Sequence, residues 1–409
     1  MTFEQPKAVA QNLCIGCGYC ASFDDVAMRK NTAGFNEPVR VSGTYDTREA
    51  ALIDQACPGY NGSQVSTPSE TKTLPHRDFL WGPFYDCMTG FSTDPAIRRN
   101  GSSGGVISGL AEWLVSSGEV DGVIATYYDP EFPIGTISTV VADPAEAALS
   151  AGSKYAPAAP LAALSHLRRA EGRYAVIGKP CDIATLRRAI AAGDPIGEKV
   201  AILLSFYCAG TPSDRGNRAV LDHLGAPPPE GLESFRHRGD GWPGRTRAVA
   251  KDGSEKSCTY GESWGTILRS HTHNLCIICP DGIGEQADLV AADAWYGDEK
   301  GYPVFEEAEG RSLIMTRTEV GRDLLTKARA AGVLECEQLE VRQIDTMQPG
   351  QWKRRRELSL RVAAYRLLGR ATPRYNRQAL KAYQRGMTAK EKVKVFYGTL
   401  RRVARTLIR

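Results

Sequence analysis

Three cysteines at three-residue steps are the first residues whose types and spacing could do chemistry. Cys14, Cys17 and Cys20 stand in the run Cys-Ile-Gly-Cys-Gly-Tyr-Cys, and Cys57 is followed by proline. Such a triplet, completed by a Cys-Pro from elsewhere in the chain, is typical of the ligands of a 4Fe-4S cluster. Asp24 occupies the local fourth position, so Cys57 is the expected substitute. The alternative is structural zinc, although zinc modules usually present their cysteines as separated pairs.

Four more cysteines form a second candidate quartet, scattered along the sequence: Cys181, Cys208, Cys276 and Cys279. If the loops that carry them meet at one edge of a sheet, four thiolates come together. The alternatives are that Cys181 and Cys208 are small buried hydrophobic residues and that the Cys-Ile-Ile-Cys run is a redox pair. The other cysteines have no partner pattern and are expected to be packing residues: Cys87, Cys258 and Cys336.

Two loops rich in glycine and serine are candidate binding segments. The first, residues 100–105, opens an expected helix with Ser102 or Ser103 as its N-cap. Unpaired N–H groups and the positive end of the helix dipole point the same way there, which suits an anion. The second, residues 152–155, has a small turn followed by a cation and an aromatic ring.

Short apolar runs alternate with helical patterns through the middle of the chain, which predicts an α/β core with its functional loops at the strand ends. The helix after 174–178 is expected to begin at Asp182. Strands are expected at residues 120–127, 174–178, 200–206 and 288–292.

We therefore predict an α+β or α/β chain in three parts. Residues 1–62 would form a small ferredoxin-like 4Fe-4S module, and residues 76–345 a mixed α/β domain. Residues 350–409 would form a basic, helical tail. The Ser-, Thr- and Pro-rich residues 59–75 read as a linker.

Composition limits the class of protein. At 409 residues, with 42% apolar and 24% charged side chains, the chain is expected to be globular with two or three domains. The first residues are polar, so no secretory signal is expected, and eleven cysteines in a cytoplasmic chain favour metal binding. No run approaches the ~20 apolar residues of a membrane span.

The C-terminal tail is strongly basic, whereas the rest of the chain has a net negative charge. Residues 350–409 hold 18 Lys and Arg against two acids, whereas the remainder holds 33 basic and 45 acidic residues. Val393, Phe396, Leu400, Val403 and Leu407 would line one helical face. This face could pack onto the chain's own body, or the helix could bind an acidic partner or an anionic membrane surface. Nucleic acid ranks last, because no aromatic-interleaved binding module accompanies the charge.

In order and spacing, six motifs resemble the coenzyme F420 hydrogenase/dehydrogenase beta-subunit family, which also includes 7-hydroxymethyl chlorophyll a reductase. They are the Cys14–Cys20 run with Cys57-Pro58, Ser-Ser-Gly-Gly-Val at 102–106, Gly-Ser-Lys-Tyr at 152–155, Gly-Lys-Pro-Cys at 178–181, Tyr-Cys-Ala-Gly at 207–210 and Cys-Ile-Ile-Cys at 276–279. The resemblance covers residues 14 to about 300, and the tail lies outside it.

The resemblance implies an iron-sulfur flavoprotein with two 4Fe-4S clusters and FAD. The two quartets would hold the clusters, the second nearer the flavin. The FAD-contacting residues would be Asn100, Ser102, Ser103, Gly104, Gly105, Ser153, Lys154, Tyr155 and Lys179. Lys179 and Asp182 would lie at the catalytic face, and here the chain departs from the family, which commonly has Gln or a similar residue where Asp182 stands.

The expected function is electron transfer from a ferredoxin-like donor or redox partner subunit, through two clusters and FAD, to a small organic acceptor. The acceptor could be coenzyme F420, a tetrapyrrole or a polysaccharide or lipid-linked intermediate. The competing hypotheses are a non-catalytic electron-transfer subunit and a zinc-bound interaction module. We expect a cytoplasmic protein, peripheral at the inner membrane face if the tail binds lipid, and leave open whether it forms oligomers.

Overall fold

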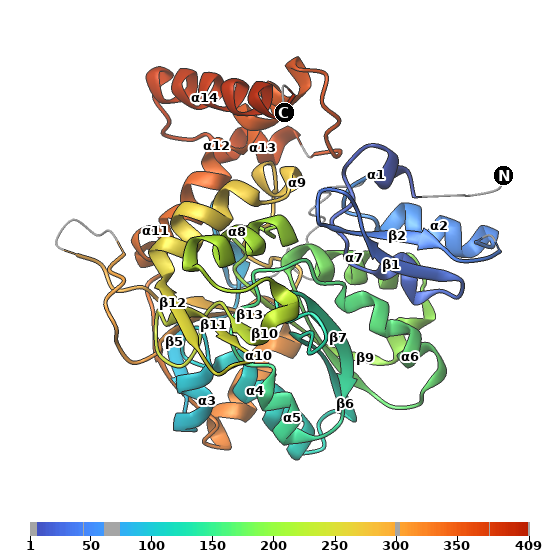
Figure 1. Cartoon of the computed structure of the whole chain (residues 1–409), viewed down its shortest axis with the longest axis vertical. Helices are drawn as coiled ribbons and strands as arrows, with labels where there is room; N and C mark the ends of the chain where they lie inside the picture. The colour runs from blue at the N-terminus through green and yellow to red at the C-terminus, as the bar shows by residue number, and fades with distance from the viewer. Residues whose placement is uncertain (1–5, 44, 61–73, 299–302, 376, 408–409) are drawn as a thin grey trace.

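A computed structural model describes residues 6–43, 45–60, 74–298, 303–375 and 377–407 (Figure 1). Of the expected linker, residues 61–73 lie outside the described part. The architecture is mixed α/β, as predicted, with one large sheet, helices on both of its faces and a helical C-terminal layer. No helix within the described ranges is long and apolar enough to cross a membrane.

The large sheet has eight strands in the order β15-β5-β14-β13-β9-β8-β6-β7. Its centre is parallel: β13 pairs with β9, β9 with β8, and β8 with β6. The outer strands are antiparallel to their neighbours. The bounds are β5 Cys87–Ser92, β6 Gly122–Tyr128, β7 Thr136–Val141, β8 Tyr174–Gly178, β9 Val200–Phe206, β13 Leu289–Asp293, β14 Ser312–Thr316 and β15 Leu334–Gln338. The predicted strands 174–178 and 200–206 are confirmed at both ends.

Helices cover both faces of this sheet, because the central strands are apolar on both sides. One core lies under α4 (Val106–Ser116), α5 (Pro144–Leu149) and α10 (Glu319–Ala330). The other lies under α6 (Leu164–Arg169) and α7 (Pro180–Ala191). α7 begins two residues before the predicted Asp182, with Pro180 in its first turn.

The prediction of Ser102 or Ser103 as a helix N-cap is wrong. A short helix, α3 (Pro95–Asn100), precedes the loop, and α4 begins only at Val106 with Gly105 as N-cap at φ 74°. The loop between them is held against the sheet, where Ser312 Oγ lies 2.6 Å from Ser103 Oγ and accepts from Gly104 N at 2.9 Å. Ser103 thus makes a tertiary contact with β14 and does not cap the helix.

The N-terminal residues form a module that shares a core with the central domain. It contains α1 (Lys7–Ala10), a hairpin of β1 (Val26–Lys30) and β2 (Asn36–Arg40), and α2 (Thr47–Ala56). Tyr19 is buried and donates to Asp194 at 2.7 Å. Arg168 pairs with the same carboxylate at 2.9 Å. Leu52 and Ile53 of α2 belong to the apolar cluster under α6 and α7, so this module is packed onto the sheet domain.

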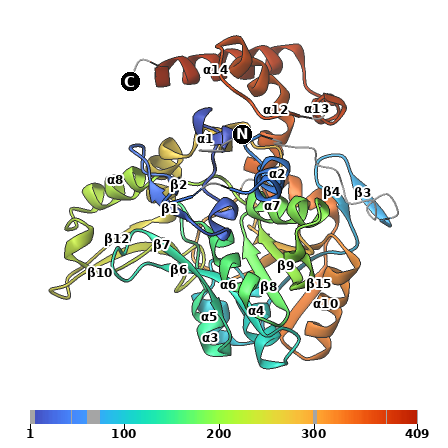
Figure 2. The same ribbon diagram turned by 90° about the vertical axis from the view of Figure 1, so that its right-hand side faces the viewer.

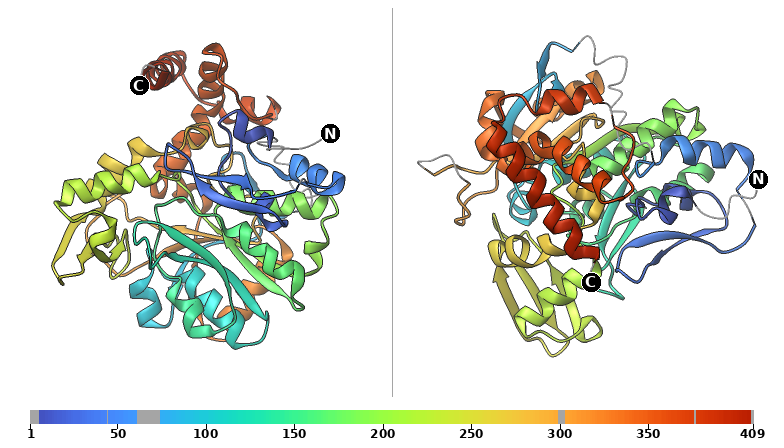
Figure 3. Two further views of the ribbon diagram at one scale, coloured as in Figure 1. Left: turned by 45° about the vertical axis from the view of Figure 1, so that its right-hand side comes forward. Right: turned by 90° about the horizontal axis from the view of Figure 1, so that it is seen from above.

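A small antiparallel sheet, which the sequence did not predict, projects from one side of the molecule (Figure 3). It packs with α8 around its own apolar cluster. The remaining elements lie at the edges: β3 pairs with β4, and α9 is a single turn. The bounds are β10 Leu232–Arg236, β11 Arg245–Ala250, β12 Glu255–Thr259, α8 Asp214–Leu224, β3 His76–Asp78, β4 Gly82–Phe84 and α9 Asn274–Ile277.

The C-terminal helices form a layer across one end of the molecule, next to α1 (Figure 2). They are α12 (Pro349–Leu367), α13 (Arg377–Tyr383) and α14 (Ala389–Leu407), and the short helix α11 (Ile344–Met347) precedes them along the side of the molecule (Figure 1). Val403 of α14 is 2% exposed and joins a core that includes Leu358 and Leu275. Val393 is 56% exposed, so the predicted apolar stripe is covered only in part. The side chain of Leu407 lies outside the described residues.

Candidate functional site

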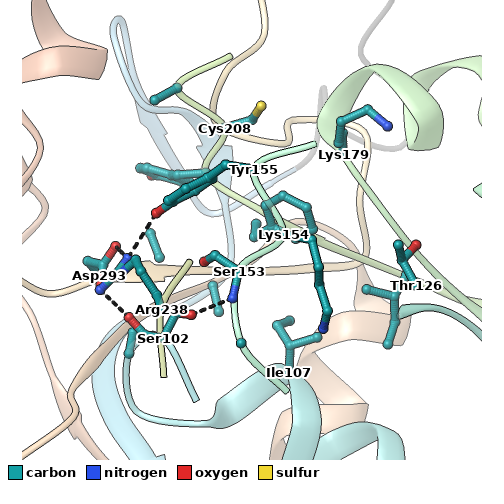
Figure 4. A pocket seen from close by; sticks show the side chains of 18 of the residues that line it. Ser102, Ile107, Thr126, Ser153, Lys154, Tyr155, Lys179, Cys208, Arg238 and Asp293 are labelled. Carbon is teal, nitrogen blue, oxygen red and sulfur yellow. Dashed lines mark hydrogen bonds and ion pairs between the residues drawn. The ribbon is translucent and has the colours of Figure 1, made fainter. Parts of the chain in front are cut away.

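A cavity of about 280 Å³ lies at the carboxyl ends of the parallel strands (Figure 4). The strand ends contribute Thr126, Gly178, Phe206 and Asp293. Open α/β sheets place their binding sites at this edge, because the loops after the strands converge there.

Most of the predicted flavin-contacting and catalytic residues line this cavity: Ser102, Ser103, Gly105, Ser153, Lys154, Tyr155, Lys179 and Asp182. The two glycine-serine loops are joined directly, since Ser153 N donates to Ser102 Oγ at 2.5 Å. Two predicted residues are elsewhere. Asn100 is exposed at the end of α3. Gly104 faces the sheet, where a Cβ atom would lie 2.5 Å from Gly90 O.

The side-chain amine of Lys154 lies in the cavity wall, and it forms no ion pair with a carboxylate of the described residues. Its side chain extends between Ile107 and Thr126 (Figure 4), and its Nζ donates to Ser150 O and, at 3.1 Å, to Ala151 O. Burial, with a smaller contribution from the charge of Arg236, lowers the pKa of Lys154 from 10.5 to about 7. Near neutral pH this amine can therefore either hold or release a proton.

Lys179 and Asp182 form a buried ion pair, with Nζ 2.8 Å from Oδ2. Lys179 also donates to Ala158 O at 3.0 Å. Burial alone would lower the pKa of Lys179, but the facing carboxylate outweighs it and the pKa is raised. The Oδ1 atom of Asp182 is buried and has no hydrogen-bond partner within the described chain.

Arg238 and Asp293 form the polar floor of the cavity, and the sequence analysis missed both. The guanidinium of Arg238 is 2% exposed and pairs with both carboxylate oxygens of Asp293, at 2.9 and 2.7 Å. Arg238 also donates to Ser102 O, which ties it to the first glycine-serine loop. An acid at the end of the buried strand β13 was a signal that could have been read from the sequence.

Aromatic side chains complete the wall on the side of the small sheet. The Arg238 guanidinium lies 4.8 Å from the ring centroid of Tyr260 and 5.2 Å from that of Trp295. Tyr155 and Trp264 pack with ring centroids 4.8 Å apart. All four aromatic rings line the cavity, which therefore offers flat, apolar surfaces beside a charged floor.

The first quartet comes together as predicted from its spacing. Cys14, Cys17, Cys20 and Cys57 all line one apolar cavity of about 20 Å³. Gly16 has φ 68°, and a Cβ there would lie 2.7 Å from Asn36 O, so the turn between the first two cysteines requires glycine. Burial, with the Asp182 carboxylate second, raises the pKa of Cys17 to about 12. Such a thiol gives up its proton only when a cation takes its place.

The second quartet is also assembled from distant loops. Cys208 follows β9 and lines the 280 Å³ cavity. Its loop lies against α9, since Thr211 N lies 3.5 Å from Cys276 Sγ. The thiol of Cys279 interacts electrostatically with those of Cys276 and Cys208, and that of Cys181 with those of Cys208 and Cys279.

No group of three or more His, Cys, Asp and Glu side chains in the described ranges has the geometry to hold a metal ion. A cluster spaces its thiolates farther apart than a single ion does, because several iron atoms lie between them. All eleven cysteines are free. Of the three cysteines expected to be packing residues, Cys87 and Cys258 are buried, and Cys336 packs against the core under α4.

Comparisons with known proteins bear on the central part of the chain, and the first quartet lies outside the range of the family models. Two family models match, the N-terminal part of the coenzyme F420 hydrogenase/dehydrogenase beta subunit over residues 87–165 and its C-terminal part over residues 171–342. The coenzyme F420 hydrogenase subunit beta of Methanococcus voltae is 25% identical over 276 residues, which cover 66% of this chain and 88% of that protein. Its counterpart from Methanothermobacter thermautotrophicus is 23% identical, covering 63% and 86%.

A solved structure supports the fold. The F420-reducing NiFe hydrogenase complex from Methanosarcina barkeri contains a chain that matches with a TM-score of 0.58 and 18% identity, covering 74% of this chain and 99% of that one. The family models leave α12, α13 and α14 outside their range. The chain belongs to the coenzyme F420 hydrogenase/dehydrogenase beta-subunit family.

Proposed function

We propose that this protein is an iron-sulfur flavoprotein oxidoreductase subunit that passes electrons from a ferredoxin-like donor or partner subunit to a small organic acceptor. The observation that carries the proposal is the position of the Lys179–Asp182 pair. It lines the large cavity, Cys181 of the second quartet lies between its two residues at the start of α7, and Thr185, one turn later on α7, lines the cavity of the first quartet. Both quartets and the cavity thus meet around one ion pair.

The first quartet fits a 4Fe-4S cluster. Its four cysteines surround one apolar space, and the glycine turn of residues 14–18 leaves no room for a side chain at Gly16. The cysteines of the second quartet are farther apart in the sequence, but the loop after Cys208 contacts Cys276, since Thr211 N lies 3.5 Å from Cys276 Sγ, and Cys208 lines the large cavity. We propose that Cys14, Cys17, Cys20 and Cys57 hold one cluster, and Cys181, Cys208, Cys276 and Cys279 the other.

The large cavity fits the ring system of a flavin. Its volume is close to the lower end of the roughly 300–1,000 Å³ usual for small-molecule sites, and both aromatic and polar side chains line it. Two buried oxygens of lining residues, Asp182 Oδ1 and Gln351 Oε1, have no hydrogen-bond partner within the described residues. A ligand that carries N–H groups would satisfy them.

When bound, the clusters supply one-electron transfer, and FAD exchanges one electron at a time with them and two with an organic molecule. The chain's own residues would hold the binding loops in place and supply the proton. Ser102 and Ser153 join the two glycine-serine loops, and Arg238 binds the backbone carbonyl of Ser102 in the first of them. Lys154 Nζ can supply or accept the proton that accompanies a two-electron reduction near neutral pH. The donor is oxidised by two electrons as the acceptor gains two electrons and a proton.

The acceptor and the partner are proposed by class. The curated relatives are named as subunits, and the solved structure is titled as a hydrogenase complex, which supports a redox partner subunit and also a non-catalytic relay role for this chain. Coenzyme F420, a tetrapyrrole and a polysaccharide or lipid-linked intermediate are the candidate acceptors. The aromatic wall favours a flat, conjugated one. A cytoplasmic location, peripheral at the inner membrane face if α14 binds lipid, is also part of this proposal.

One experiment tests the cofactor assignment. The protein is purified without oxygen, and iron, sulfide, zinc and flavin are measured per chain together with the absorption spectrum. Cys57→Ser should lose one cluster and keep the flavin, whereas Cys279→Ser should lose the other and alter flavin reduction. Cys258→Ser is the matched control, because that cysteine is buried in the small sheet. Zinc without iron or flavin, or full iron in both quartet variants, would refute the proposal.

A further inference from the structure

We propose that α12, which lies outside the family match, sets the reduction potential of the second quartet's cluster through the positive charge of Arg354. This inference rests on the proposed function, since it requires a 4Fe-4S cluster on Cys181, Cys208, Cys276 and Cys279. It adds a role for the C-terminal layer, which packs over the loops that carry three of these cysteines.

The loop of Cys208 is held by α12. Arg354 Nη1 donates to Cys208 O at 2.8 Å, and its Nη2 donates to Ala209 O. Gln351, one turn earlier on the same helix, donates from Nε2 to Cys208 O at 2.9 Å. The carbonyl of a proposed ligand therefore accepts from two side chains of one helix.

The loop of Cys276 and Cys279 is held in the same way from the C-terminal layer. Arg361 Nη1 donates to Ile277 O at 3.1 Å. Tyr375 donates from its hydroxyl to Ile278 O at 2.7 Å. Both acceptors lie between the two cysteines, so α12 and the residues that follow it cover this loop and limit its contact with water.

Arg361 and Arg354 differ in whether an acidic side chain offsets their charge. Arg361 is paired with Glu357 one turn away, which offsets its charge. The contacts of Arg354 go to the backbone carbonyls of Cys208 and Ala209, and among the described residues Arg354 forms no ion pair with an acidic side chain. Reduction adds one negative charge to a cluster, so a nearby cation that is not neutralised stabilises the reduced form. Arg354 therefore raises the potential, and it acts as a positioning residue that does not touch the cluster itself.

The test is a redox titration of the anaerobically purified full chain, followed by the electron paramagnetic resonance of each reduced cluster. Arg354→Gln should lower the ratio of reduced to oxidised second cluster on the order of tenfold at a fixed potential, equivalent to about 59 mV for one electron. Arg354→Lys should stay close to the wild type, because it keeps the charge. Lys353→Gln removes the same charge from an exposed neighbouring position of α12 and should change the ratio less than about twofold.

The outcomes separate the inference from the proposed function. Iron for only one cluster in the wild type, unaffected by Cys279→Ser, would refute the second cluster itself. Two intact clusters whose potentials do not change in Arg354→Gln would refute the inference alone. Loss of the second cluster in both Arg354→Gln and Arg354→Lys would also overturn it, since the residue would then act through geometry rather than charge. If only the Gln variant lost the cluster, the charge would be confirmed as the feature that matters.

Discussion

Replacing Lys154 with methionine should stabilise the protein, although it removes two hydrogen bonds. The pKa of this amine falls from 10.5 to about 7, and each pKa unit corresponds to about 1.4 kcal/mol. The buried ammonium therefore costs the native state about 4–5 kcal/mol at and below neutral pH. Against this gain, the variant leaves Ser150 O and Ala151 O without their donor, which costs it about 1 kcal/mol for each lost hydrogen bond. The net gain in the free energy of unfolding should be about 2–3 kcal/mol.

The same pKa shift predicts how this gain depends on pH. Between pH 7 and 10.5 the unfolded state binds a proton on Lys154 that the native state does not, so the stability of the wild type rises with pH in this window. Below pH 7 both states are protonated, and the cost is present in full. The advantage of Lys154→Met over the wild type should therefore be largest at pH 6–7, vanish near pH 9 and reverse by about 1 kcal/mol at pH 10, where the two lost hydrogen bonds outweigh the small remaining cost.

Urea unfolding of the anaerobically purified proteins, followed by far-ultraviolet circular dichroism at pH 6, 7 and 9, measures this difference. Lys199→Met is the control, because Lys199 also donates to a backbone carbonyl, that of Ala170, but lies outside the cavity. A Lys154→Met variant that is less stable than the wild type at pH 6, or that keeps the wild-type dependence on pH, would refute the reasoning.

Three further predictions follow from the contacts of the site. Asp293→Asn leaves the Arg238 guanidinium buried without its carboxylate and should lower the free energy of unfolding in urea by about 3–5 kcal/mol. The control Asp240→Asn, at an exposed ion pair, should lower it by under about 1 kcal/mol. A decrease below about 1 kcal/mol for Asp293→Asn would contradict the role of the buried pair. Ser102→Ala removes the acceptor of Ser153 N and should weaken flavin binding several-fold in a fluorescence titration, whereas unchanged affinity would separate the two loops from flavin binding. Gly16→Ala should abolish the first cluster by iron analysis, while Gly118→Ala, also at positive φ but with nothing within 4 Å, should keep its iron; equal iron in both would show that the close approach to Asn36 is not needed.

The parts of the site that the sequence predicted are those that depend on local spacing or on continuous apolar runs. The Cys14–Cys20 triplet needs only a turn of seven residues, and β8 and β9 are apolar throughout because they are covered on both faces. Their carboxyl ends then had to lie side by side, which brought Lys179 and Cys208 to one cavity.

Other parts depend on contacts between residues far apart in the chain. Arg238 and Asp293 are recognised as a pair only once the small sheet has been placed beside β13. The start of α4 was mispredicted because Ser312, about 200 residues later, binds Ser103 and Gly104. Local propensity for capping cannot register such a partner. Nor could charge counting show that a basic tail donates to the carbonyls of two cysteine loops.

The spread of the two quartets along the chain has a consequence for biosynthesis. All four cysteines of the first quartet have been synthesised by residue 57, whereas the second quartet is complete only at Cys279, after about two thirds of the chain has left the ribosome. α12, which contacts the loops of three of these cysteines, Cys208, Cys276 and Cys279, is made later still. On the proposed function, metal could enter the first site during translation, while the second would have to be loaded in the interval before α12 folds over it.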